Sequence, residues 1–178
     1  FLEIAKAFTG NDIPFVPLKG PVLSYRIYND PSYRYFNDLD FLIDTDSIEG
    51  AVRILKELGY HTPVYDLPEE ACRRKMLYRH MNEILLYNPE KRMGIDLHWQ
   101  LFTGGKNVKD QLLYGLIESN KMKISFQGQA FTVFSPEFEL LYLIIHGGLH
   151  AWRRLKWLVD IRDMTEKMEF NQPLFKKL

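Results

Sequence analysis

Two aspartates stand two positions apart at the start of an apolar run, in the stretch YRYFNDLDFLID. Side chains alternate along a β-strand, so Asp38 and Asp40 would share one face, while Leu39 and Phe41 would pack on the other. Two neighbouring carboxylates repel each other unless a cation or a proton intervenes. Because Mg²⁺ binds through a few carboxylates, waters and substrate phosphates, the pair predicts a metal site. The alternative is an ordinary turn before a strand.

The stretch GIDLHWQL repeats this alternation later in the chain. Asp96 and His98 would share one face of a strand, opposite Ile95 and Leu97. If this strand lies beside the first in a suitable register, the three carboxylates could hold two metal ions that activate the attacking oxygen and clamp a phosphoryl group. A carboxylate inside an apolar strand strengthens this prediction, because an unpaired buried charge is costly. His98 is a candidate for the same cleft, and a structural histidine is the alternative.

An extended segment that ends in Lys19 and Gly20 is followed directly by a predicted helix beginning at Pro21. A helix N-terminus presents free N–H groups and the positive end of the helix dipole, which suits a phosphate. Gly20 would let a ligand approach the backbone closely, and Lys19 would add a positive charge. The spacing of a Walker loop is absent. The alternative is a strand–turn–helix corner with a solvated lysine.

The elements that must position these residues alternate between helical and extended patterns. We predict helices at 1–12, 21–29, within 44–60, and at 68–80, 108–118, 135–150 and 152–168. We predict strands at 13–20, 39–43, 60–65, 82–88 and 93–101, with a hairpin at 121–134. Because hairpins interrupt the alternation, the fold class is α+β, with a mixed β-sheet and helices packed on it. We expect an α/β core at 1–134 and a C-terminal helical region at 135–178 packed on that core, in what is expected to be a piece of a longer protein.

The composition limits the classes of function. The chain has 178 residues, of which 46% are hydrophobic, so one sizeable core can form. Lys plus Arg and Asp plus Glu balance at 23 each, which argues against a generally basic nucleic-acid surface. No apolar run is long enough to span a bilayer, so no membrane partner is expected. The single cysteine, Cys72, cannot form an internal disulfide, and a cytoplasmic location is expected.

Four blocks in this order, PLKG, YRYFNDLDFLI, GIDLHWQL and IIHGGLHAWRRLKWLVDI, together resemble the nucleotidyltransferase superfamily of the DNA polymerase β type. More closely, the chain is similar to the uncharacterised nucleotidyltransferase family of bacteria. The resemblance implies that Asp38 and Asp40 are paired metal ligands. It implies that Asp96 is a third ligand and a possible base, and that Gly20 admits the triphosphate. Relatives carry a small residue after this glycine, whereas this chain has Pro21.

Further residues are candidates for nucleotide binding. Ser24 lies one turn into the helix after Gly20 and offers a hydroxyl group. The resemblance implies that Arg34 occupies the position of a basic residue that holds a phosphate. It also implies that the C-terminal helical region covers the nucleotide, so either Lys156 or Asp160 could reach the site. A surface ion pair between Lys156 and Asp160 is the alternative.

Together, these observations predict a metal-dependent nucleotidyltransferase. It would move a nucleoside monophosphate from a nucleoside triphosphate such as ATP to an unknown acceptor with release of pyrophosphate, using Mg²⁺ or Mn²⁺. A small molecule, a sugar, a protein or an RNA end remain open as acceptors, and the neutral charge disfavours a long nucleic acid. The alternatives are a non-catalytic nucleotide-binding module and a partner-binding protein with the same fold.

Overall fold

The computed structural model describes residues 1–63, 66–101 and 109–171. The chain folds as two compact units, each made of two segments. The first unit comprises Phe1–Gly20 and Arg34–Gly105, and the second comprises Pro21–Tyr33 and Lys106–Leu178. The division predicted from the sequence, into a core at 1–134 and a helical region at 135–178, stays a prediction.

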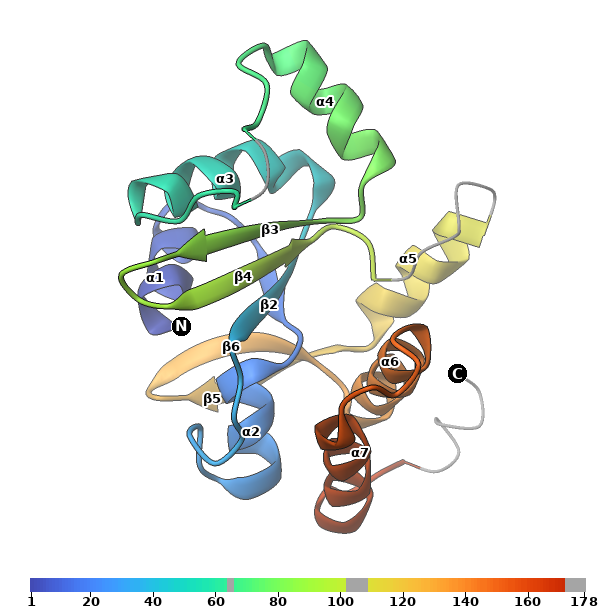
Figure 1. Cartoon of the computed structure of the whole chain (residues 1–178). Helices are drawn as coiled ribbons and strands as arrows, with labels where there is room; N and C mark the ends of the chain where they lie inside the picture. Colours follow the sequence, from blue (N-terminus) through green and yellow to red (C-terminus); the bar gives the residue numbers. More distant parts are fainter. Residues whose placement is uncertain (64–65, 102–108, 172–178) are drawn as a thin grey trace. The chain divides into compact units, whose positions relative to one another are not determined.

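The first unit contains a four-stranded mixed sheet (Figure 1). Its strands lie in the order β1 (Phe15–Pro17), β2 (Asp38–Ile43), β4 (Met93–His98) and β3 (Glu83–Asn88). The two central strands, β2 and β4, run parallel, while the edge strands β1 and β3 pair antiparallel to their neighbours. The α+β class with a mixed sheet is therefore confirmed.

One face of this sheet carries the hydrophobic core. The apolar alternates of the central strands, such as Phe41 and Leu97, are fully buried there together with Ile4 and Phe8 of α1 (Leu2–Gly10) and Leu55 of α3 (Ile48–Glu57). Figure 1 shows α1 and α3 on the same side of the sheet. A 3-10 turn, Thr45–Ser47, precedes α3, and α4 (Ala71–His80) contributes a buried tyrosine to the same cluster. Because the apolar residues occupy one face, the opposite face is left for the polar alternates.

The second unit contains α2 (Gly20–Tyr28) from Pro21 onward, and five further helices and strands described in the C-terminal part. These are α5 (Lys109–Ser119), the hairpin β5 (Lys121–Phe126) and β6 (Gln129–Phe134), α6 (Pro136–Leu149) and α7 (Leu155–Lys167). The hairpin turns at Gln127 and Gly128, as predicted, and both residues have positive φ. Ser135 caps α6 by accepting a hydrogen bond from the Phe138 N–H, which confirms the predicted N-cap.

Two local predictions need correction. Residues 60–63 do not form a strand, and His61 makes only an isolated bridge to Tyr87, while residues 64–65 lie outside the described residues. Pro63 has no N–H to donate to a β-ladder, which explains why the pairing that begins at His61 does not continue as a strand. The last helix begins at Leu155 and not at Trp152, because Ala151 and Trp152 both have positive φ. Within the described ranges, none of the helices combines the length and the apolar character needed to cross a bilayer.

Candidate functional site

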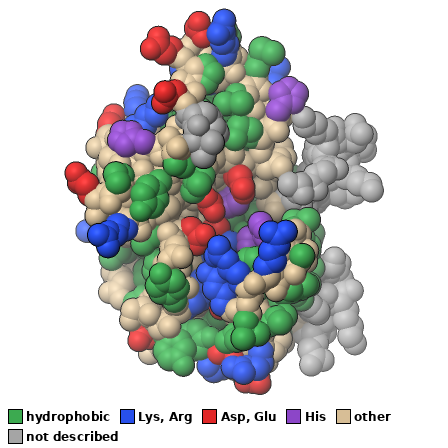
Figure 2. All heavy atoms as spheres, viewed as in Figure 1, with side chains coloured by type: hydrophobic (Ala, Val, Ile, Leu, Met, Phe, Trp, Pro, Cys, Tyr) green, Lys and Arg blue, Asp and Glu red, His purple; other side chains and the backbone are tan. Residues whose placement is uncertain are grey.

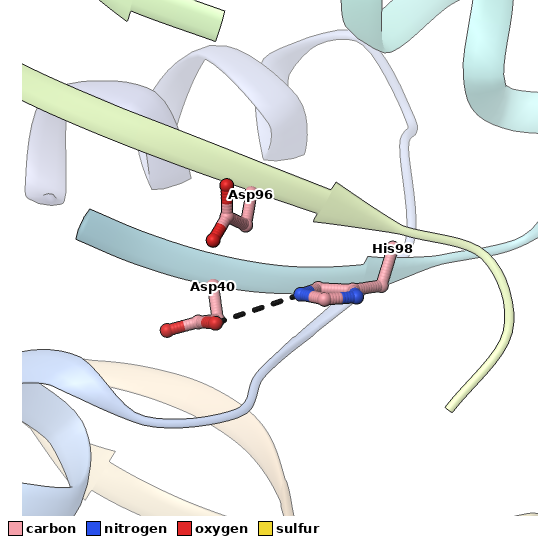
Figure 3. A group of neighbouring side chains, drawn as sticks. All are labelled: Asp40, Asp96 and His98. Atoms are coloured by element: carbon pink, nitrogen blue, oxygen red, sulfur yellow. Dashed lines mark ion pairs between the residues drawn. The ribbon is translucent and has the colours of Figure 1, made fainter. Parts of the chain in front are cut away.

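The polar face of the four-stranded sheet gathers charged side chains from neighbouring strands. Asp40 and Asp96 are direct partners in the parallel β2–β4 ladder, so both carboxylates project from the same face. His98, two residues further along β4, shares that face. Each of these three side chains offers a ligand atom within 4.8 Å of the other two. Figure 3 shows them pointing toward one another, and Figure 2 shows acidic side chains and a histidine gathered over the sheet.

Asp40 is held by a buried lysine. The Lys19 Nζ lies 2.7 Å from Asp40 Oδ1, and both side chains are almost completely buried. The neighbouring backbone fixes this approach, because the Leu18 N–H donates to the Asp40 carbonyl at 3.0 Å. Burial alone would raise the pKa of Asp40, but the Lys19 ammonium and His98 outweigh burial and keep the pKa well below its usual range. Asp40 is therefore ionised at neutral pH.

Asp96 experiences the opposite balance. Burial and the negative charge of Asp40 raise the pKa of Asp96 to about 6. The nearby charge of His98 offsets these two effects only in part. Two adjacent carboxylates, one of them short of counter-charge, form a donor set that a divalent cation fits.

His98 connects this pair to a fourth acidic residue. Its Nδ1 donates to Glu83 Oε2 at 2.8 Å, and its Nε2 lies 3.5 Å from Asp40 Oδ1. Burial disfavours the charged imidazole, but the carboxylates of Asp40 and Glu83 outweigh burial and raise the pKa of His98 to about 9. The hydrogen bond from His98 in turn lowers the pKa of Glu83.

Glu83 is a site residue that the sequence reasoning missed. It begins β3 and is the direct partner of His98 in the β3–β4 ladder. A signal was available: the turn at residues 89–92 sets Asn88 opposite Met93, and counting back from this pair places Glu83 opposite His98. Alternation along β3 then puts Glu83 on the polar face.

Asp38, at the start of β2, is half-buried and faces the same side as Asp40 by alternation. Its direct partner in β4 is Gly94. The group of ligand atoms found within 4.8 Å among the described residues consists of Asp40, Asp96 and His98, so the structure does not bring Asp38 into that group. Its assignment as a ligand stays a prediction.

The turn between β1 and α2 has the geometry that requires glycine. Gly20 has φ +66°, a left-handed conformation that side chains with a Cβ rarely adopt. A Cβ at this position would be 3.4 Å from Leu39 Cδ2, which is an ordinary contact, so the backbone conformation and not the space selects glycine. Helix α2 begins at this residue, directly after Lys19.

The remaining candidates are buried or half-buried. Arg34, in the first unit, is 7% exposed. Ser24, in the second unit, is fully buried, and its Oγ donates to the Asp30 carbonyl at 2.7 Å. Lys156 is half-buried on α7. Nucleotide-binding roles for these three residues stay predictions.

Comparison with known sequences identifies the family. The profile of a family described as "Uncharacterised nucleotidyltransferase" matches residues 1–177. No curated protein sequence matches the chain.

The fold is similar to solved nucleotidyltransferase structures. The lincomycin-bound lincosamide antibiotic adenylyltransferase LnuA is 16% identical, with a TM-score of 0.63 over 92% of this chain and 93% of that chain. ANT(2")-Ia in complex with adenylyl-2"-tobramycin is 11% identical, with a TM-score of 0.59 over 93% of this chain and 86% of that chain. An antigenic nucleotidyltransferase-like protein from Paracoccidioides brasiliensis is 17% identical, with a TM-score of 0.54 over 96% of this chain and 75% of that chain. At these identities the likeness concerns the fold.

Proposed function

The chain belongs to the uncharacterised nucleotidyltransferase family, and from this premise we propose that it transfers a nucleoside monophosphate from a nucleoside triphosphate to an acceptor, releasing pyrophosphate. The observation that carries the proposal is the direct pairing of Asp40 with Asp96 on adjacent parallel strands. Lys19 and His98 offset part of the repulsion between the two carboxylates, yet the pKa of Asp96 stays raised to about 6, which supports a site that a further cation would complete.

The carboxylates would hold Mg²⁺ or Mn²⁺. Asp40 and Asp96 are the two ligands that the geometry supports, and Asp38 is the third ligand that the family resemblance implies. When bound, the metal ion stabilises negative charge on the transferring phosphoryl group. We also propose Asp96 as the base for the attacking acceptor, which is supported by its being less buried than Asp40 and directly beside it.

Lys19 would change partners when the nucleotide binds. In the structure its ammonium neutralises Asp40 at 2.7 Å. A metal ion on Asp40 would repel the ammonium, and a triphosphate would offer it a new anionic partner. Gly20, directly after Lys19, would let the same phosphates approach the backbone closely. Nucleotide-binding roles for Arg34 and Lys156 follow from the family resemblance, and that of Ser24 from its place one turn after Gly20 in the sequence.

ATP is the proposed donor, and a hydroxylated small molecule is the proposed acceptor. Two solved structures of similar fold are described as an antibiotic adenylyltransferase and as a complex with adenylyl-2"-tobramycin, which supports this choice. The balanced net charge supports a small acceptor over a long nucleic acid. A cytoplasmic location, where ATP and Mg²⁺ are available, belongs to the same proposal.

The test is a pyrophosphate-release assay with each nucleoside triphosphate, Mg²⁺ or Mn²⁺, and a panel of hydroxylated small molecules. Calorimetry with the same nucleotides measures binding separately. We expect metal-dependent nucleotide binding, and pyrophosphate release that requires an acceptor. Binding without release across the whole panel would support the non-catalytic module, and no metal-dependent binding would reject both functions.

A further inference from the structure

The two imidazole nitrogens of His98 differ in their hydrogen bonding. Nδ1 donates to Glu83 Oε2 at 2.8 Å. Nε2 is buried and forms an ion pair with Asp40 Oδ1 at 3.5 Å, but among the described residues it has no partner at hydrogen-bond geometry. Buried polar atoms in proteins are nearly always hydrogen-bonded, so an atom left without such a bond calls for an explanation. A ligand that reaches Nε2 would supply it.

The unsatisfied nitrogen faces the candidate metal site. Figure 3 shows the ring projecting from the end of β4 toward the carboxylates of Asp40 and Asp96. The ligand atoms of these three residues lie within 4.8 Å of one another, a separation that one ion can bridge. His98 is only 8% exposed, so little water competes for this position.

Glu83 has the features of a positioning residue for this imidazole. Metal-bound histidines usually donate the second ring N–H to a carboxylate or a carbonyl, which fixes the tautomer and the ring orientation. The Glu83 carboxylate is in that relation to Nδ1, and the β3–β4 ladder sets the two residues opposite each other. The arrangement therefore presents Nε2, and not Nδ1, to the carboxylates.

We propose that His98 is a nitrogen ligand of the metal centre, that Glu83 positions it, and that the mixed donor set makes the centre select first-row transition ions over Mg²⁺. The inference rests on the proposed function for the location of the metal centre. It goes beyond that function because three carboxylates alone would form an all-oxygen site. Imidazole nitrogen favours transition ions, whereas carboxylate oxygen suits Mg²⁺.

The test compares the affinities of Co²⁺ and Mg²⁺ by calorimetry in the wild type and in variants of this pair. His98→Gln should weaken Co²⁺ binding by about 10- to 100-fold, the range found when residues that support metal ligands are mutated. Mg²⁺ binding should weaken by less than about threefold, because Mg²⁺ relies on the carboxylate oxygens. Glu83→Leu should lower the Co²⁺ affinity in the same direction, and Glu83→Gln should restore most of it, because its amide oxygen still accepts the Nδ1–H bond.

Glu90→Gln is the matched control. Glu90 is an exposed acidic residue in the turn between β3 and β4, so its substitution should leave the affinities for Co²⁺ and Mg²⁺ unchanged. The Glu83 variants alter an exposed side chain, so they provide a test even if His98→Gln fails to fold.

A spectroscopic measurement identifies the ligand directly. In long-range ¹H–¹⁵N spectra of the wild type, adding diamagnetic Zn²⁺ should shift the Nε2 resonance of His98 and leave that of Nδ1 nearly in place. A Zn²⁺ titration that leaves Nε2 unmoved, or a ratio of Co²⁺ to Mg²⁺ affinity that is the same in wild type and His98→Gln, would overturn the inference. Wild-type pyrophosphate release would in that case leave the proposed function standing, whereas a wild type that binds neither ion would reject both.

Discussion

Two buried aspartates, Asp40 and Asp163, differ in how completely their charges are met. Asp163 on α7 accepts hydrogen bonds from Tyr28 Oη at 2.6 Å, from Arg162 Nε at 2.8 Å and from Lys167 Nζ at 3.3 Å. Asp40 has Lys19 at 2.7 Å and the longer ion pair with His98 at 3.5 Å, but it also has the carboxylate of Asp96 beside it.

The difference separates a structural carboxylate from a candidate ligand. The hydrogen bond from Tyr28 and those from Arg162 and Lys167 lower the pKa of Asp163 to about 2 with no competing anion among the main contributors. On the sheet, the low pKa of Asp40 coexists with the pKa of Asp96 raised to about 6. Titratable neighbours with opposite pKa shifts mark a functional site more specifically than burial does.

The largest expected effect is the loss of turnover in Asp40→Asn. Removing one charged ligand should lower metal affinity and pyrophosphate release by at least about 100-fold, since changes in residues behind the ligands already cost 10- to 100-fold. Calorimetry and the pyrophosphate assay measure the two quantities. Asp163→Asn is the matched control and should leave metal affinity unchanged. Equal metal affinity in wild type and Asp40→Asn would refute the assignment of Asp40.

Lys19→Met should come second, with an effect on stability. Without the ammonium, the buried Asp40 carboxylate loses its main counter-charge, and the free energy of unfolding of the metal-free protein should fall by about 3 kcal/mol. Urea denaturation in the presence of a chelator measures this change. Nucleotide affinity should also fall, while metal affinity should hold or rise because a competing cation is gone. A decrease in metal affinity would show that Lys19 supports the metal site instead of substituting for the ion.

Asp96→Asn should have the opposite effect on the metal-free fold. Removing the second carboxylate relieves the repulsion with Asp40, so the free energy of unfolding at pH 7 should rise by about 1–2 kcal/mol. Adding Mg²⁺ should stabilise the wild type and not the variant, because only a folded site binds the ion. Thermal denaturation with and without Mg²⁺ tests both points. A variant less stable than the wild type in chelator would mean that the Asp40–Asp96 pair is not strained.

The smallest effect concerns pH and Asp163. A carboxyl group whose folded pKa lies below its unfolded value contributes stability that is present above the unfolded pKa and is lost as the pH falls through the folded pKa. With the usual value near 3.8 and the folded value about 2, this contribution should disappear between about pH 4 and pH 2. In Tyr28→Phe the loss should begin at the same pH but be smaller and be complete at a higher pH, because the folded pKa of Asp163 moves back toward its unfolded value when its largest contributor is removed. The measurement is the free energy of unfolding of wild type and variant at several pH values between about 2 and 5. The same pH dependence in both proteins would contradict this account.

Local chemistry made most of the elements predictable from the sequence. The N-cap at Ser135, the turn at Gln127–Gly128 and the alternation around Phe41 each involve residues within a few positions of one another. Such short-range patterns identify an element without knowledge of its neighbours. The same reasoning failed at residues 60–63, where the sequence pattern predicted a strand but His61 forms an isolated bridge with Tyr87.

The candidate site was predictable in part. Alternation alone placed Asp40 with Asp38, and Asp96 with His98, on single faces of their strands. The role of Glu83 could have been found by counting across the β3–β4 turn, because a short turn sets the register of an antiparallel pair. The ion pair of Lys19 with Asp40 had no such signal, since it joins the end of one segment to the middle of another strand.

The sequence by itself determined which residues line each face of each strand, because alternation is a property of the local backbone. Only the tertiary structure decided that β2 and β4 lie side by side, parallel, with Asp40 opposite Asp96. A parallel pair has no tight turn to set its register, and here the connection runs through α3, α4 and β3. The close approach of the two carboxylates is therefore a consequence of how the whole sheet packs on its core.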